Sequence, residues 1–210
     1  LPASIVDYLS SVGDEGETPK SFPHNTYYLL NTLPDSCEYA RQAAESLGLN
    51  ALILTSFLEG ESRDAGTFLA SLAREIQARG TPIEPPCLLI AAGETTTTIL
   101  DSAEITGHGG PGHELTAGFA LTAAKAPGVA ALSIDTEGTD GTTSAAGGLC
   151  VSTTLARARA AGVDLHAALR GHASHEALST LGDVIVTGNT GTNLCDLNLV
   201  YVPALVRSDS

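Results

Sequence analysis

Residues 134–148 have the densest potential for chemistry in this chain, and they read Ile-Asp-Thr-Glu-Gly-Thr-Asp-Gly-Thr-Thr-Ser-Ala-Ala-Gly-Gly. They follow an apolar run at 129–134, and a loop directly after a buried strand is where open α/β sheets place their ligands. The loop is too acidic to hold a bare phosphate, but carboxylate oxygens are ligands that Mg²⁺ prefers. We therefore predict that Asp135, Glu137 and Asp140 are the catalytic residues and bind a metal, which in turn holds a phosphate.

Three further polar stretches could contribute to the same site. Residues 107–114 read Gly-His-Gly-Gly-Pro-Gly-His-Glu and lead into a predicted helix, where free amides favour an anion. Residues 187–193 offer amides and small hydroxyls but lack the lysine of a P-loop. Glu94 and Thr95 follow a predicted strand and are expected to orient the groups that contact substrate. The residues predicted to bind substrate or phosphate are Gly107, His108, Gly109, Gly110, His113, Glu114, Thr190, Gly191, Thr192 and Asn193.

Each stretch also has a purely structural interpretation, as a solvated acidic turn, a flexible loop or a hairpin turn. Their combination favours a site, because loops at the strand ends of one sheet can converge on one crevice. A metal-dependent phosphatase is a weaker hypothesis: it needs a nucleophilic aspartate beside a general acid, and the Asp135–Glu137 spacing matches that poorly.

Composition excludes several partners. The chain has 210 residues, 43% hydrophobic and 4% aromatic, with a net charge of −14, which argues against nucleic acid and anionic membranes. Between residues 80 and 154 the only basic residue is Lys125, against eight acidic residues, so a phosphorylated ligand needs cations from elsewhere. The four cysteines form no C-x-x-C pair, which favours reduced thiols of a cytoplasmic protein over a zinc site.

Apolar segments alternate with helical patterns along the chain and predict a three-layer α/β/α fold with a mixed, mostly parallel sheet. Residues 1–22 are expected to form a lead segment, a helix end followed by a loop, and residues 23–210 a single domain. Two predicted strands, 95–99 and 197–202, follow turns too short for a crossover and are expected to run antiparallel. The other predicted strands are 26–31, 50–56, 87–92, 129–134 and 183–187, and the helices are 35–47, 63–79, 114–125, 154–161, 165–169 and 176–181.

Four strings occur in an order that resembles the type-2 glycerate kinase family, whose C-terminal part is called the MOFRL domain. They are residues 93–96 (Gly-Glu-Thr-Thr), 107–114, 136–147 and 187–196. The likeness covers about residues 86–203, and the stretch 58–63 (Leu-Glu-Gly-Glu-Ser-Arg) is similar to the family's Gly-Glu-Ala-Arg stretch.

The resemblance implies phosphorylation of glycerate or a related small hydroxy acid, with ATP as co-substrate and Mg²⁺ as cofactor. The family also carries the older name hydroxypyruvate reductase, but no convincing dinucleotide fingerprint supports a reductase here. Family members have an N-terminal Rossmann-like domain that supplies a lysine. This domain is absent from the chain, so we expect a C-terminal domain that is incomplete, and weakly active or inactive, without such a partner in cis or in trans.

One departure from the family pattern bears on the substrate. The family string Gly-Gly-Arg-Asn-Gln-Glu reads Gly-Gly-Pro-Gly-His-Glu here, so Pro111 replaces an arginine that would clamp a phosphate or carboxylate. An alternative hypothesis is therefore a non-catalytic module that binds a sugar acid or a protein partner. The identity of the hydroxy acid, the hydroxyl that is phosphorylated and assembly into a homo-oligomer stay open.

Overall fold

The computed structural model describes residues 1–101, 103 and 105–204, and the chain divides into two units, Leu1–Leu30 and Asn31–Ser210. The first unit holds α1 (Ala3–Ser11) and the short 3₁₀ helix η1 (Asp14–Gly16), and it extends eight residues beyond the predicted lead segment 1–22. The strand predicted at 26–31 is wrong: this segment is not in the sheet, and Tyr27, Tyr28, Leu29 and Leu30 are exposed. The aromatic and β-branched residues of this segment favour a strand, but the described residues show no strand pairing for it.

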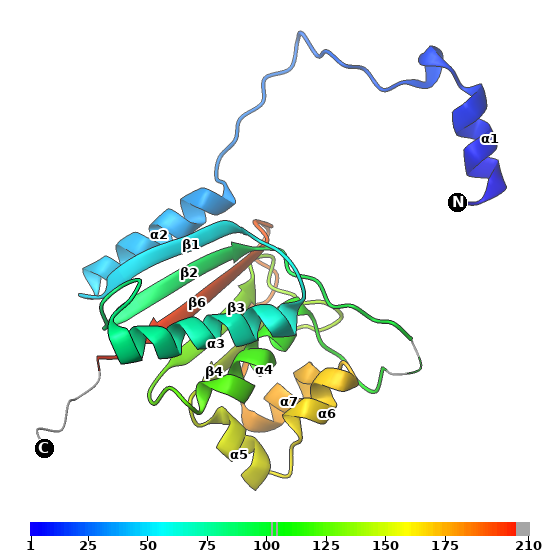
Figure 1. Cartoon of the computed structure of the whole chain (residues 1–210). Helices are drawn as coiled ribbons and strands as arrows, with labels where there is room; N and C mark the ends of the chain where they lie inside the picture. Colours follow the sequence, from blue (N-terminus) through cyan, green and yellow to red (C-terminus); the bar gives the residue numbers. More distant parts are fainter. Residues whose placement is uncertain (102, 104, 205–210) are drawn as a thin grey trace, which may run out of the picture. The chain divides into compact units, whose positions relative to one another are not determined.

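The second unit is built on a mixed sheet with strand order β1-β2-β6-β3-β4-β5 (Figure 1). Strands β1, β2, β3 and β5 run in one direction and β4 and β6 in the other, so the predicted mixed sheet is confirmed. Among the six strands of the described residues, only β1 and β2 are parallel neighbours. Antiparallel β6 lies between β2 and β3, and antiparallel β4 lies between β3 and β5. The strands are β1 (Asn50–Leu58), β2 (Cys87–Gly93), β3 (Ala130–Asp135), β4 (Gly147–Val151), β5 (Val184–Ile185) and β6 (Asp196–Val202).

Two strand predictions need correction. Residues 95–99 form no strand and contribute a single isolated bridge, between Thr96 and Glu61. Strand β4 was not predicted, because its sequence Gly-Gly-Leu-Cys-Val is short and shows no alternation. The antiparallel direction predicted for β6 is confirmed.

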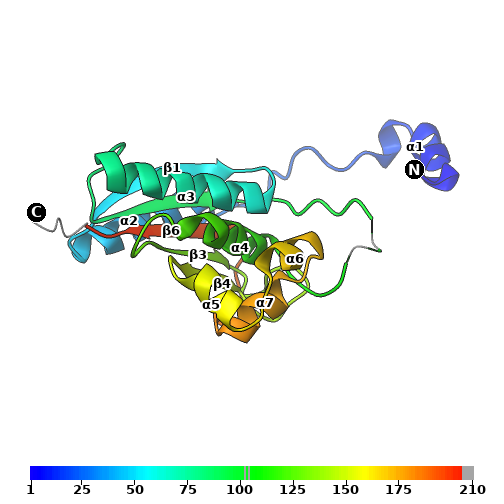
Figure 2. The ribbon, with the colours of Figure 1, turned by 60° about the horizontal axis from the view of Figure 1, so that its bottom comes forward.

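Helices cover both faces of the sheet, which confirms the three layers (Figures 1 and 2). On one face α2 (Leu33–Ser46) places Cys37 against Ile90 and Ala92. On the other face the main core packs under α3 (Ser62–Arg79) and α4 (Pro111–Ala123). The remaining helices are α5 (Thr154–Ala160), α6 (Leu165–Arg170) and α7 (Ser174–Leu181).

Helices α3 and α4 pack backbone to backbone through two glycines. A Cβ at Gly66 would lie 2.0 Å from the carbonyl oxygen of Leu115, and one at Gly118 would lie 2.3 Å from that of Arg63. Helix α4 starts at Pro111, three residues earlier than predicted, and proline suits that position because its fixed φ is already helical. This close contact fixes where the start of α4 lies relative to the sheet.

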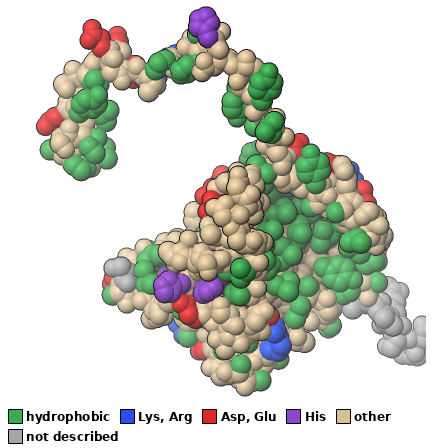
Figure 3. Space-filling view, turned by 180° about the vertical axis from the view of Figure 1, so that it is seen from behind, with side chains coloured by type: hydrophobic (Ala, Val, Ile, Leu, Met, Phe, Trp, Pro, Cys, Tyr) green, Lys and Arg blue, Asp and Glu red, His purple; other side chains and the backbone are tan. Residues whose placement is uncertain are grey.

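Among the described residues no helix is long and apolar enough to cross a membrane. On the second unit, hydrophobic side chains gather on the face seen from behind, and histidine side chains lie near one another on the same face (Figure 3). The first unit carries a histidine of its own in this view.

Candidate active site

Three strand ends bring carboxylates together at one edge of the sheet. Strand β2 leads into Glu94, β3 ends at Asp135 and β6 begins at Asp196. Since β6 runs antiparallel to both neighbours, its first residue pairs with Gly93 on one side and with Asp135 on the other. The acidic loop 135–141 continues from this edge. The site is therefore formed by loops that meet where β2, β6 and β3 lie side by side.

A cavity of about 280 Å³ opens at this edge. No Lys or Arg of the described chain lines it, although Pro111, Asn193 and Cys195 do. We call it the acidic pocket. Its five carboxylate side chains are Glu94, Asp135, Glu137, Asp140 and Asp196.

Among the carboxyl groups of the pocket, Asp196 has a strongly raised pKa. Its side chain is 6% exposed, and burial raises its pKa to about 8, helped by the negative charges of Asp140, Asp135 and Glu94. No hydrogen bond among the described residues stabilises its carboxylate. Burial also raises the pKa of Asp135, although its Oδ1 accepts the amide N–H of Glu137 at 3.0 Å. Neither carboxyl is paired with a cationic side chain among the described residues.

Asp140 has a different environment, because its charge is already matched by N–H groups. Its side chain accepts the amide of Gly112 at 3.1 Å, the amide of His113 at 2.7 Å and the Nδ1 of the His113 ring. Asp140 is 1% exposed and His113 is fully buried. The N-terminal amides of α4, predicted to bind a substrate anion, are thus occupied by a carboxylate of the protein itself.

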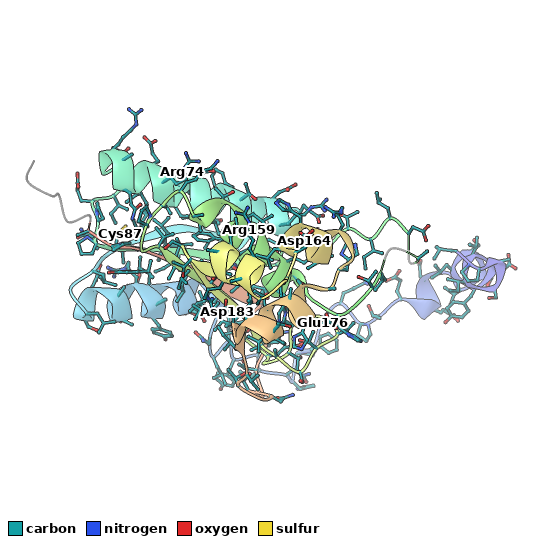
Figure 4. All side chains as sticks on the ribbon, turned by 90° about the horizontal axis from the view of Figure 1, so that it is seen from below. Arg74, Cys87, Arg159, Asp164, Glu176 and Asp183 are labelled. Atoms are coloured by element: carbon teal, nitrogen blue, oxygen red, sulfur yellow. The ribbon has the colours of Figure 1, made fainter. Side chains whose placement is uncertain are left out.

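The rest of the glycine-rich loop 107–112 is held by α7. The amide of His108 donates to the Glu176 carboxylate at 2.9 Å, and its carbonyl accepts the amide of His175 at 2.9 Å. Figure 4 shows Glu176 on α7. On the other side, the amide of Thr142 donates to the Gly109 carbonyl at 3.3 Å. Residues Gly107, His108, Gly109, Gly110 and His113 do not line the acidic pocket.

Loop 187–193 adjoins the pocket through Asn193 and is exposed throughout. The Asn193 amide donates to Glu137 Oε2 at 3.0 Å, and the Thr190 amide donates to the Glu137 carbonyl at 3.0 Å. Asn193 reaches the pocket, whereas Thr190, Gly191 and Thr192 lie outside its lining. This loop keeps hydroxyls accessible to solvent beside the carboxylates.

The remaining predicted residues separate into two groups. Glu94 lines the pocket, while Thr95 is buried and accepts a hydrogen bond from Ser62 at 3.0 Å. Glu114 is also buried and faces away from the pocket lining, with its Oε1 2.8 Å from His172 Nδ1. The structure brings Asp135, Glu137, Asp140, Glu94 and Asn193 together and leaves Thr95 and Glu114 outside.

Sequence reasoning missed Asp196 and Cys195 as site residues. Asp196 directly precedes the strand predicted at 197–202, so its position at a strand end could have been read from the sequence. That it lies at the pocket follows only from the antiparallel register of β6, which pairs it with Asp135. Cys195 has a positive φ of 62° and lines the pocket, and all four cysteines are free, as predicted.

A larger cavity of about 670 Å³ adjoins the acidic pocket, and Glu94 and Cys195 line both. Leu33, Phe57 and Leu58 give it an apolar wall. Within the described residues, no three acidic, histidine or cysteine side chains already converge on one point as metal ligands do.

The fold and the pocket define an α/β domain that concentrates carboxylates and polar loops at one sheet edge. The MOFRL family model matches residues 87–196, which is more than half of the chain, and the chain belongs to this family. The match includes every strand end that forms the acidic pocket.

Individual relatives agree with the family. The chain is 41% identical over 194 residues to a glycerate 2-kinase of Pyrococcus horikoshii, covering 90% of this chain and 42% of the relative. It is 36% identical to a putative hydroxypyruvate reductase of Agrobacterium vitis over 89% of this chain and 42% of that protein. A crystal structure of glycerate kinase from Thermotoga maritima superposes with a TM-score of 0.82 and 35% identity over 89% of this chain and 44% of that one. The chain thus spans less than half the length of these relatives.

Proposed function

We propose that this chain is the C-terminal domain of a glycerate kinase-like enzyme, which transfers the γ-phosphoryl group of ATP to a hydroxyl of glycerate or a related hydroxy acid. The observation that carries the proposal is the acidic pocket, with Asp196 buried and without a hydrogen-bond partner among the described residues. Family membership and two relatives named glycerate 2-kinase support the substrate class.

The carboxylates of the pocket fit Mg²⁺, a hard cation that binds oxygen ligands. Asp135, Glu137, Glu94 and Asp196 would hold it, because their side chains line the cavity. Burial and neighbouring carboxylates raise the pKa of Asp135 and Asp196, and a bound cation would offset that repulsion. Asp140 is predicted as a metal ligand, but its carboxylate already accepts from three N–H donors. We therefore assign it a structural role in the lining of the pocket and not a role in binding the metal. When bound, Mg²⁺ neutralises charge on the phosphate oxygens of ATP.

The other residues of the chain position the reactants. Loop 187–193 is exposed, and threonine hydroxyls and backbone amides are groups that bind phosphate oxygens. The hydroxyl and amide of Thr190 already bond within the protein and would have to exchange these partners for a phosphate. The adjoining cavity, with its apolar wall at Leu33 and Phe57, has room for an organic group next to the acidic pocket. Since no Lys or Arg of the described chain lines the pocket, the remaining positive charge would come from an N-terminal domain, in cis or in trans. The free thiols fit a reducing compartment such as the cytoplasm.

One observation favours a non-catalytic binding module instead. Pro111 lines the acidic pocket at the position of the family arginine, and proline offers no charge or donor to an acidic substrate. In that case the pocket binds a cation and a sugar acid or partner without transferring phosphate.

Two measurements test the proposal. Mn²⁺, as a paramagnetic substitute for Mg²⁺, should bind the chain in a titration followed by EPR, and Asp135→Asn should weaken binding at least tenfold, whereas Asp101→Asn outside the pocket should not. No Mn²⁺ binding by the unmodified chain would refute the metal site.

Turnover separates the two functions. We expect little ADP release from Mg-ATP and glycerate by the chain alone, and Mg-dependent release by the full-length protein that loses at least a hundredfold in Asp135→Asn. Mn²⁺ binding without turnover in the full-length protein supports the binding module. Robust turnover by the isolated chain would contradict the need for a second domain.

A further inference from the structure

A chain of three side chains, of which Asp140 and His113 are buried and His175 is half-buried, joins the acidic loop, α4 and α7. Asp140 contacts His113 Nδ1, and His113 Nε2 lies 3.2 Å from Nδ1 of His175 on α7. The two imidazole rings meet edge to face, with centroids 5.1 Å apart. Both nitrogens of His113 are thus engaged within the protein.

A carboxylate only accepts hydrogen bonds, so His113 donates from Nδ1 to Asp140. The Nε2 of His113 and the Nδ1 of His175 share a second hydrogen bond, whose donor is set by the tautomers of the two rings. Burial and the neighbouring His113 lower the pKa of His175, in keeping with a neutral ring. Glu176 and His108 also face this group, and they pair with each other at 2.7 Å.

The local backbone is shaped around the Asp140 carboxylate. A Cβ at Gly110 would lie 2.1 Å from Asp140 Oδ1, and a Cβ at Gly112 would lie 3.2 Å from Oδ2. Any larger residue at Gly110 would displace the carboxylate. The two glycines before and within the first turn of α4 therefore let the carboxylate sit directly against the helix N-terminus, where the helix dipole and free amides favour a negative charge.

We propose that the Asp140 carboxylate is the anion that occupies the α4 N-terminus and that His113 and His175 are positioning residues which hold it there. Phosphate is consequently excluded from this helix end. The glycine-rich loop 107–112 then serves to admit a carboxylate of the protein, not a ligand. This inference does not depend on the proposed function, because it concerns which anion occupies α4.

The first test follows the amides of Gly112 and His113 by ¹H–¹⁵N NMR while inorganic phosphate is added. In the unmodified chain these two amides should not respond to phosphate. In Asp140→Ala the helix end is vacated, so both amides should shift and saturate. Glu137→Gln removes one negative charge from the same pocket without opening α4 and should leave them unresponsive. Saturable shifts of these amides in the unmodified chain, or none in a folded Asp140→Ala, would overturn the proposal.

A second test stays informative if Asp140→Ala does not fold. The Nδ1 proton of His113, buried and bonded to a carboxylate, should give a low-field ¹H resonance protected from exchange with solvent. His113→Gln keeps a side-chain amide donor and should lose this resonance while retaining the fold, and His175→Ala should shift or broaden it. The exposed His108→Ala should leave it in place. Its absence from the unmodified chain, or its persistence in His113→Gln, would contradict the assignment.

Discussion

The two sides of the candidate site differ in how their polar groups are satisfied. On the locked side, which we define as residues 107–113 with Asp140, the amides of His108, Gly112 and His113 all donate to carboxylates of the protein. On the open side, defined as residues 187–193 with Asp196, the loop is exposed and the buried carboxylate of Asp196 has no hydrogen-bond donor among the described residues.

The comparison shows why a glycine-rich loop is not by itself a binding loop. Free amides at a helix start attract any anion that can reach them, and a carboxylate on a neighbouring loop has the advantage of being tethered. A satisfied group contributes to stability, whereas an unsatisfied buried charge raises the free energy of the folded state until a ligand neutralises it. We therefore expect the locked side to stabilise the fold and the open side to bind a ligand.

The largest expected effect tests the open side through pH. The folded-state pKa of Asp196 is about 8, above the unfolded value of 3.8, so the folded state holds a proton that the unfolded state releases. This contribution is present at low pH and is lost as the pH rises toward 8. Asp196→Asn should match the unmodified chain near pH 4 and exceed its stability by on the order of 5 kcal/mol near pH 8. Urea unfolding across this range measures the difference, and a constant offset would contradict the burial of an unpaired carboxyl.

The next effect tests how tightly the locked side is packed. Gly110→Ala places a methyl group against Asp140 and should destabilise the chain by about 3 kcal/mol through overpacking. Gly188→Ala, on the open side, meets no atom within 4 Å but has a φ of +72°, so it should cost only about 1 kcal/mol of backbone strain. Thermal unfolding measures both losses of stability. Equal losses for the two variants would show that the two loops tolerate an added methyl group equally well, which would contradict the close packing at Gly110.

Metal addition tests whether the open side is a binding site. If Mg²⁺ binds only the folded chain, a hundredfold excess over Kd should stabilise it by about 2.7 kcal/mol. Calorimetric unfolding with and without Mg²⁺ measures this gain. Asp135→Asn should reduce it strongly, while His113→Gln, on the locked side, should retain it. The same gain in both variants would place the ion elsewhere.

The smallest effect concerns the exposed rim. Asn193→Ala removes one hydrogen bond to Glu137, and because that bond is exposed, the free energy of unfolding should change by no more than about 0.5 kcal/mol. A loss of several kcal/mol in urea unfolding would mean that loop 187–193 is a structural element like the locked side.

Local sequence patterns predicted most elements of the second unit. Periodic apolar residues identified α3, and the apolar runs located β2 and β3 within one residue at each end. The failures occurred where pairing partners decide the outcome: residues 26–31 read as a strand but have no sheet neighbour among the described residues, and β4 is a strand only because β3 and β5 flank it. The alternation of apolar and polar residues along a segment does not reveal which strand, if any, the segment will pair with.

For the site, the sequence by itself determined the chemistry: a carboxylate-rich loop after a strand, two glycine-rich loops and a shortage of basic residues. Family membership follows from the order of those strings and is shown by the match to residues 87–196. Only the tertiary structure decided which groups meet. The insertion of β6 between β2 and β3 brings Asp196 to the pocket, and the backbone contact of α3 with α4 helps to place Asp140 against the start of α4. The physical reason is that charge and hydrogen-bonding capacity belong to residue types, whereas whether a donor is satisfied depends on neighbours that are distant in sequence.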